Sequence, residues 1–241
     1  MLLKIVMFVL AADVMVLSPM FVKAQKDGPC KKSLLLKMTA ATGYFIMGLL
    51  GIAASGTFTK FDKIMLVALA LSWIGDLFLH LWQHDVYHAI GFLGFFSAHF
   101  FFIWAYVTGI NAMQPGTPFF DLPSIIFVAV FDVCFIIFAL VTKMNLKGII
   151  ALPIILYATV ITTMLAKAVR LGITAVSTVY PHGAFILVFA AVGALLFVMS
   201  DFSISVLMFN EKQKTNYKLK MFNIVTYFAA ELLLAALTLF Y

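Results

Sequence analysis

The sequence has very few charged residues. Only 11% of its 241 residues are Asp, Glu, Lys or Arg, whereas soluble domains contain about 25%. With 64% hydrophobic residues and a mean hydropathy of +1.11, the chain cannot cover a globular surface with polar groups. This scarcity excludes an ordinary soluble domain and predicts a membrane protein.

Cysteine and long polar segments are also scarce. The two cysteines are Cys30, in a polar loop, and Cys134, in an apolar run, so we expect no disulfide. The net charge of +6 would suggest a nucleic-acid partner in a soluble protein. Here the lysines lie between apolar runs, so membrane topology explains the charge and we expect no nucleic acid to bind.

The apolar runs that are present predict an all-α fold, a polytopic membrane bundle of about eight transmembrane helices of roughly 20 residues each. We expect residues 1–241 to form a single integral membrane domain, with a first span and loop in 1–33 and the core bundle in 34–241. The expected spans are Leu2–Val22, Leu34–Ala54, Phe61–Trp82, Ala89–Ile110, Leu122–Thr142, Gly148–Ala166, His182–Met208 and Met221–Phe240.

The first apolar run could be either a span or a cleaved signal peptide. Its length favours a retained span, and residues 21–24 form a poor small-residue cleavage site. Eleven of the 16 Lys and Arg residues fall on the side of the loops that follow the first, third, fifth and seventh spans. The positive-inside rule therefore predicts that both termini lie outside the cytoplasm.

Two aspartates lie inside predicted spans in similar surroundings. Asp76 follows Gly75 in the third span, and Asp201 follows Ser200 in the seventh. A carboxylate is costly in an apolar environment, so an intramembrane aspartate indicates a functional site. Both spans cross in the same direction, which predicts two like-oriented halves of four helices with the carboxylates facing each other across a cavity near one leaflet.

The predicted pair suits acid–base chemistry. Apolar surroundings disfavour the charged form of each carboxyl group, and two neighbouring carboxylates disfavour double ionisation. We therefore expect one protonated and one ionised carboxyl group at neutral pH, the combination that general acid–base catalysis requires. Ser72 and His80 lie one turn before and after Asp76 on the same helix face. The alternative is that each aspartate makes only a structural contact.

Other polar residues give weaker indications. His80, His84 and His88 recur every four residues, a spacing that on one continuous helix would suit a metal such as zinc. His99 in the fourth span and Tyr157 after Pro153 could support the site, or could serve only in packing. Three further acidic residues lack a companion motif, and a packing or pore-facing position is the favoured interpretation for them: Asp13, Asp132 and Glu231.

Several segments together resemble the YhhN family of eight-span membrane proteins, which includes lysoplasmalogenases. They are GDLFL at 75–79, GFLGFFSAHFFFIWAY at 91–106, Pro153 and Tyr157 with Met164, and GALLFVMSD at 193–201. The resemblance implies that the paired aspartates of the family fall on Asp76 and Asp201, and its histidine in the fourth span on His99. The three histidines at 80, 84 and 88 match no pattern of the family.

The resemblance also implies an activity, the hydrolysis of the vinyl ether of a lysoplasmalogen to a fatty aldehyde and a glycerophospho-base. We expect a lysophospholipid substrate that enters from the bilayer, in either a bacterial plasma membrane or the endoplasmic reticulum. This chemistry requires carboxyl groups and water but no metal or redox cofactor. The alternatives are a proton-coupled transporter, a zinc-dependent membrane lipid hydrolase and a non-catalytic lipid-binding protein.

Overall fold

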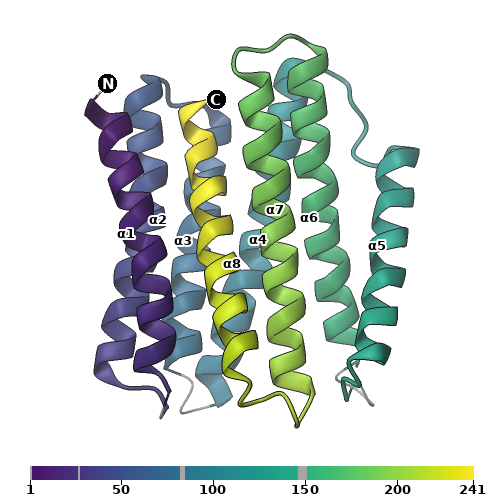
Figure 1. Cartoon of the computed structure of the whole chain (residues 1–241). Coiled ribbons are helices and arrows are strands. Elements are labelled where there is room, and N and C mark those ends of the chain that lie inside the picture. Colours follow the sequence, from purple (N-terminus) through teal and green to yellow (C-terminus); the bar gives the residue numbers. More distant parts are fainter. Residues whose placement is uncertain (1, 27, 82–84, 146–150) are drawn as a thin grey trace.

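The computed structural model describes residues 2–26, 28–81, 85–145 and 151–241. Within these residues the chain forms eight long helices (Figure 1), all long and apolar enough to cross a membrane. The prediction of an all-α, multi-pass membrane bundle is therefore confirmed. The helices are α1 (Leu2–Ala24), α2 (Lys31–Ser55), α3 (Lys60–His80), α4 (Asp85–Met113), α5 (Leu122–Val141), α6 (Ala151–Ser177), α7 (Gly183–Phe209) and α8 (Tyr217–Ala236), which continues into a short 3-10 turn, η2 (Leu237–Leu239).

Helix α6 extends well beyond its predicted end. We expected residues 167–180 to form a loop, but the helix continues to Ser177. The amino group of Lys167 donates hydrogen bonds to the Phe119 carbonyl and to the Ser124 hydroxyl, so a buried cation is tolerated in the helix. Lys167, at the start of the predicted loop, therefore belongs to a buried face of α6.

Helix α8 also begins earlier than predicted. Its first residue is Tyr217, because the Asn216 side chain accepts a hydrogen bond from the Leu219 N–H at 3.1 Å and caps the helix. Lys218 and Lys220 therefore lie in the first turn of the helix instead of the loop. The predicted start of the sixth span, at Gly148, lies outside the described residues.

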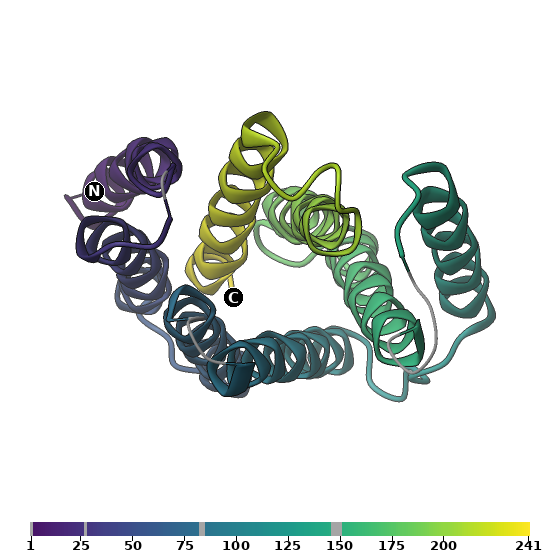
Figure 2. The ribbon, with the colours of Figure 1, turned by 90° about the horizontal axis from the view of Figure 1, so that it is seen from below.

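The helices pack as a ring with two outliers. Around the ring, α2 packs on α3, α3 on α4, α4 on α6, α6 on α7, α7 on α8, and α8 back on α2. Helix α1 lies outside against α2 and α8, and α5 lies outside against α6 (Figure 2). The fourth helix of each half thus contacts the second helix of the other half. This is the contact pattern expected of two like-oriented four-helix halves.

Close packing of α3 on α4 depends on glycine. A Cβ atom on Gly94 would lie 3.1 Å from the backbone nitrogen of Gly75 and 3.2 Å from the Leu71 carbonyl oxygen. Small residues let the two helix backbones approach this closely, as is common between membrane helices. Because Gly75 directly precedes Asp76, this contact fixes the backbone that carries the aspartate.

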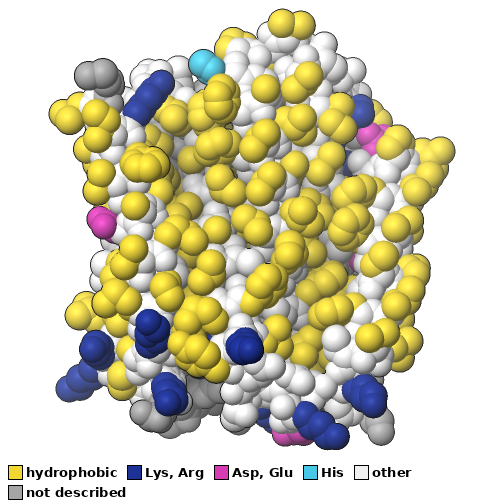
Figure 3. All heavy atoms as spheres, viewed as in Figure 1, with side chains coloured by type: hydrophobic (Ala, Val, Ile, Leu, Met, Phe, Trp, Pro, Cys, Tyr) yellow, Lys and Arg dark blue, Asp and Glu magenta, His cyan; other side chains and the backbone are white. Residues whose placement is uncertain are grey.

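The positive charges gather at one end of the bundle. Lysine and arginine side chains lie mainly along the lower edge in Figure 3, where α1 and α7 end and α2 and α8 begin. Asp76 and Asp201 lie in the last turns of α3 and α7, which end on the same side. Both aspartates are therefore nearer to the lysine-rich end.

Candidate functional site

A cavity of about 410 Å³ opens between the helices, a size within the range of small-molecule pockets, about 300–1,000 Å³. Its walls come from α3, α4, α6, α7 and α8, with single contributions from α2 and α5. Most lining side chains are apolar, but Asp76 and Asp201 both belong to the wall, with Lys37, Tyr157 and Tyr227. The fold thus brings two aspartates that are 125 residues apart in sequence to one largely apolar cavity.

Asp76 is surrounded by hydrogen-bond donors. The Lys37 ammonium lies 3.0 Å from Asp76 Oδ1 and also donates to the Asp76 backbone carbonyl at 2.9 Å. Asp76 Oδ2 accepts from the Tyr44 hydroxyl at 3.0 Å and from the Tyr227 hydroxyl at 2.6 Å. The side chain is 1% exposed, so this charge is almost completely withdrawn from solvent. A cation and two hydroxyl donors together satisfy the ionised form of this carboxylate.

Asp201 has fewer partners. The Tyr157 hydroxyl donates to Asp201 Oδ2 at 2.5 Å, and His99 Nε2 lies 3.7 Å from the same oxygen. No lysine or arginine pairs with this carboxyl group among the described residues. With a single hydrogen-bond donor and no fixed cation, Asp201 can carry a proton without losing a strong partner.

The hydrogen bonding of His99 determines its tautomer. His99 Nδ1 lies 2.6 Å from the Phe95 backbone carbonyl, which can only accept, so Nδ1 carries a hydrogen. In the neutral ring, Nε2 is then an acceptor, and this buried atom makes no hydrogen bond with the described residues. Nε2 and Asp201 Oδ2 therefore attract each other only when a proton resides on one of the two groups.

The two aspartate environments are built from equivalent helices. Each aspartate has a tyrosine from the second helix of its own half and a polar ring from the fourth helix of the opposite half. These partners are Tyr44 and Tyr227 at Asp76, and Tyr157 and His99 at Asp201. Only Asp76 has a lysine in addition, so two similar frameworks hold carboxyl groups of unequal charge environment.

Of three other residues that the sequence indicated, Ser200 lines the cavity and Ser72 and His80 do not. Ser200 lines the cavity, and its hydroxyl donates to the Asn223 carbonyl at 3.1 Å, which joins α7 to α8. Ser72 is fully buried behind the cavity wall, and its hydroxyl has no hydrogen-bond partner among the described residues. His80 makes a 3.1 Å hydrogen bond with Ser33 and is not part of the cavity lining.

The predicted row of histidines, at 80, 84 and 88, does not lie on one continuous helix. Helix α3 ends at His80 and α4 begins at Asp85, so His80 and His88 belong to different helices, and His84 lies outside the described residues. A single-helix metal site therefore loses its geometric basis, because the spacing of four residues places side chains on one face only within one helix. Among the described residues, no three His, Cys, Asp or Glu side chains form a group that could hold a metal ion.

The sequence interpretation missed part of the site. Lys37 lies within the predicted second span and is a buried residue of α2, but the sequence interpretation did not single out Lys37, Tyr44 or Tyr227. The available indication was that each of these polar side chains lies within an apolar run, where burial requires a partner. Glu231, interpreted as packing or pore-facing, is also fully buried in α8.

The other two acidic residues lie elsewhere. Asp132 accepts hydrogen bonds from Thr159 at 2.8 Å and Thr162 at 2.9 Å, which joins α5 to α6. Asp13 is exposed on α1. Neither belongs to the cavity lining.

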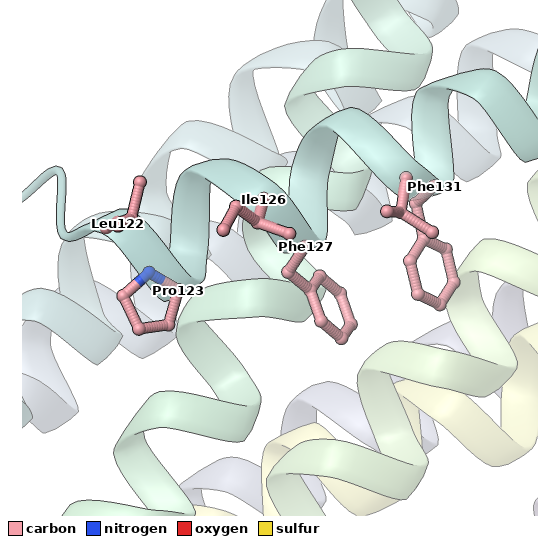
Figure 4. A pocket seen from close by; sticks show the side chains of 6 residues that line it. Leu122, Pro123, Ile126, Phe127 and Phe131 are labelled. Carbon is pink, nitrogen blue, oxygen red and sulfur yellow. The ribbon is translucent and has the colours of Figure 1, made fainter.

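A second hollow lies on the surface of α5, away from the aspartates. It is lined by apolar side chains, among them Pro123, Phe127 and Phe131 (Figure 4). It contains no titratable group, so it offers no chemistry of its own.

Comparison with known proteins identifies one relationship. The model of the YhhN family matches residues 32–238, which include the whole of α3 to α8 and nearly all of α2. No curated protein and no solved structure matches the chain.

Proposed function

The chain belongs to the YhhN family, and from this membership and the paired aspartates we propose that it is a lysoplasmalogenase-type hydrolase. The substrate is a lysophospholipid whose single chain is joined to glycerol by a vinyl ether. The carrying observation is that Asp76 and Asp201 share one apolar cavity while only Asp76 is paired with a cation. Such an arrangement supports one ionised and one protonated carboxyl group.

The unequal environments support distinct roles. Asp201 is the general acid, because it has one hydroxyl donor and an uncharged neighbour, His99 Nε2, toward which a proton can be held. Asp76 is the fixed negative charge, because the Lys37 ammonium group and two tyrosine hydroxyl donors pair with its carboxylate. The division resembles the two carboxyl roles of glycoside hydrolysis.

The reaction then proceeds by protonation of the vinyl ether, addition of water and cleavage of the hemiacetal. Asp201 transfers its proton to the outer vinyl carbon, and the double bond becomes an oxocarbenium-like cation that the Asp76 charge stabilises. Water adds to the cationic carbon and returns a proton to the Asp201 carboxylate, which gives a hemiacetal. The hydroxyl group of the hemiacetal then loses its proton, the glycerol oxygen gains one, and cleavage of the carbon–oxygen bond to glycerol releases the fatty aldehyde and the glycerophospho-base.

The cavity wall supports a lipid substrate. Phe92, Phe95, Ile161 and Met208 contribute apolar surface next to the carboxyl groups, which suits a hydrocarbon chain because its transfer from water is favourable. The lysine-rich end of the bundle lies on the side of the aspartates, where a phosphate head group would be attracted.

The alternative functions have less support. Helices α3 and α7 run without interruption past their aspartates, whereas transporters commonly bind their ions at broken helices. The zinc-dependent hydrolase required the histidines to lie on one helix, but His80 belongs to α3 and His88 to α4.

The first prediction concerns aldehyde release. Purified protein in detergent should release fatty aldehyde from a lysoplasmenyl lipid, and Asp201→Asn and Asp76→Asn should each lose it by at least about a hundredfold, since general acid catalysis alone contributes about 10²–10⁴. Asp13→Asn, on the exposed face of α1, is the matched control and should keep wild-type activity. Full activity in both cavity variants would rule out the proposed carboxyl pair.

A further inference from the structure

A second polar cluster lies behind the cavity wall, in the middle of the bundle. Its centre is Glu231 on α8, whose side chain is fully buried and whose two carboxyl oxygens make no hydrogen bond with the described residues. Ser72 on α3 and Tyr106 on α4 are equally buried, and their hydroxyl groups are also without partners there. The mechanism derived above uses none of these three groups.

The three side chains belong to one neighbourhood. Ser72 lies one turn before Asp76 on α3, and Glu231 lies one turn after Tyr227 on α8, while Tyr227 and Asp76 are hydrogen-bonded to each other. The Ser72 hydroxyl lies next to the Glu231 carboxyl group without a hydrogen bond of normal geometry, and Tyr106 is within electrostatic reach of the same carboxyl group. Tyr227 also lies close to Glu231, but its hydroxyl hydrogen is directed at Asp76.

Glu231 is also within electrostatic range of both aspartates, Asp76 and Asp201. No cation pairs with it among the described residues, and the buried Lys37 is bound to Asp76. An ionised carboxylate in this place would be fully desolvated and repelled by Asp76, so the ionised form is unfavourable there. A neutral carboxylic acid avoids burying a charge and has one hydrogen to donate.

Buried polar groups nearly always have hydrogen-bond partners. A neutral carboxyl group and two hydroxyl groups supply both donors and acceptors, and a buried water molecule typically makes about three hydrogen bonds with such groups. A cation is a poorer occupant, because its binding would require the ionised form of Glu231.

We propose that Glu231, Ser72 and Tyr106 form an internal binding site for ordered water, held by the neutral carboxyl group of Glu231. If the proposed hydrolase function is correct, on which this second part rests, the site supplies water to a reaction that takes place within the bilayer. Tyr227 separates the site from the cavity, since it lines the cavity and lies next to Glu231. Glu231 is then a positioning residue, because it acts through water.

Radiolytic labelling with ¹⁸O water tests the site directly, because bound water oxidises the side chains that it contacts. In the wild-type protein Tyr106 should be labelled, and the bound water that supplies the label should exchange slowly with bulk water. Glu231→Leu removes the polar atoms and should lower this labelling several-fold, whereas Glu231→Gln, which keeps a donor and an acceptor, should retain it. Asp132→Asn, at the α5–α6 contact, is the control and should change nothing.

A stability measurement separates water binding from folding. Because Leu replaces a buried polar group without a protein partner, Glu231→Leu should keep or raise the melting temperature while aldehyde release falls several-fold. If this variant does not fold, Ser72→Ala serves in its place and should lower the labelling in the same way. Unchanged labelling in both variants overturns the water site, as does occupancy by a metal ion. Absence of aldehyde release by the wild type overturns the proposed function instead, and leaves the labelling result to be judged by itself.

Discussion

At the scale of single residues, the two aspartates differ in what surrounds them more than in where they lie. Both line one cavity, and each accepts a hydrogen bond from a tyrosine of the preceding helix in its half. The difference is Lys37, whose ammonium group contacts both the side chain and the backbone carbonyl of Asp76. One added cation makes two similar carboxyl groups chemically unequal.

This ion pair leads to a prediction on stability. Lys37→Met leaves the Asp76 charge buried and without its cation, which should destabilise the protein by about 3–5 kcal/mol. The double variant Lys37→Met, Asp76→Asn removes both charges and should recover most of this loss. Unfolding in detergent by heat or denaturant measures both, and Lys32→Met, an exposed lysine of the same helix, is the control. A double variant that is less stable than Lys37→Met would contradict the account.

At the scale of helices, the sequence predicts which segments form membrane helices better than it predicts where those helices begin and end. Eight apolar runs of membrane-spanning length correspond to eight helices because apolar length alone determines which segments can cross a bilayer. The predicted loop at 167–180 is wrong, because α6 continues to Ser177 and a contact from the α4–α5 connection satisfies the Lys167 ammonium group. Such contacts depend on the tertiary structure and cannot be read from the local sequence.

The start of α5 gives a prediction at this scale. Asp121 caps the helix by accepting a hydrogen bond from the Ser124 N–H at 2.9 Å, and it lies 3.5 Å from Arg170 of α6. Partial burial acts in the opposite direction, but the hydrogen bonds from Ser124 and the charges of Lys167 and Arg170 lower the pKa of Asp121 below its ordinary value of 3.8. Because the folded pKa is the lower one, this stabilisation is present above about pH 4 and is lost as the pH falls through the folded pKa.

Asp121→Ala should therefore cost about 1 kcal/mol at neutral pH, the usual contribution of a helix cap. Asp121→Asn keeps a capping oxygen and should lose less, and the difference between the wild type and Asp121→Asn should shrink below pH 4. Thermal unfolding at pH 7 and at about pH 3 checks both expectations. Equal losses in the two variants at pH 7 would show that the cap contributes nothing.

At the scale of the whole molecule, the site forms because each aspartate is contacted by a side chain from the last helix of the other half of the bundle. The sequence predicted a pair of aspartates and two like-oriented halves, because Asp76 and Asp201 have similar flanking residues and spans of the same direction. It could not predict that Tyr227, in the last helix, meets Asp76 in the third, or that His99 meets Asp201. These contacts arise where α8 and α4 pass the opposite half, a long-range arrangement without a local pattern.

The central claim is that a carboxyl group of this cavity protonates the outer carbon of a vinyl ether, and hydrolysis in D₂O tests it most directly. Mass spectrometry of the fatty aldehyde released from a lysoplasmenyl lipid should find one deuterium on the carbon next to the carbonyl group, with release lost in Asp201→Asn. Aldehyde without this deuterium, or release that persists in Asp201→Asn, would contradict the account.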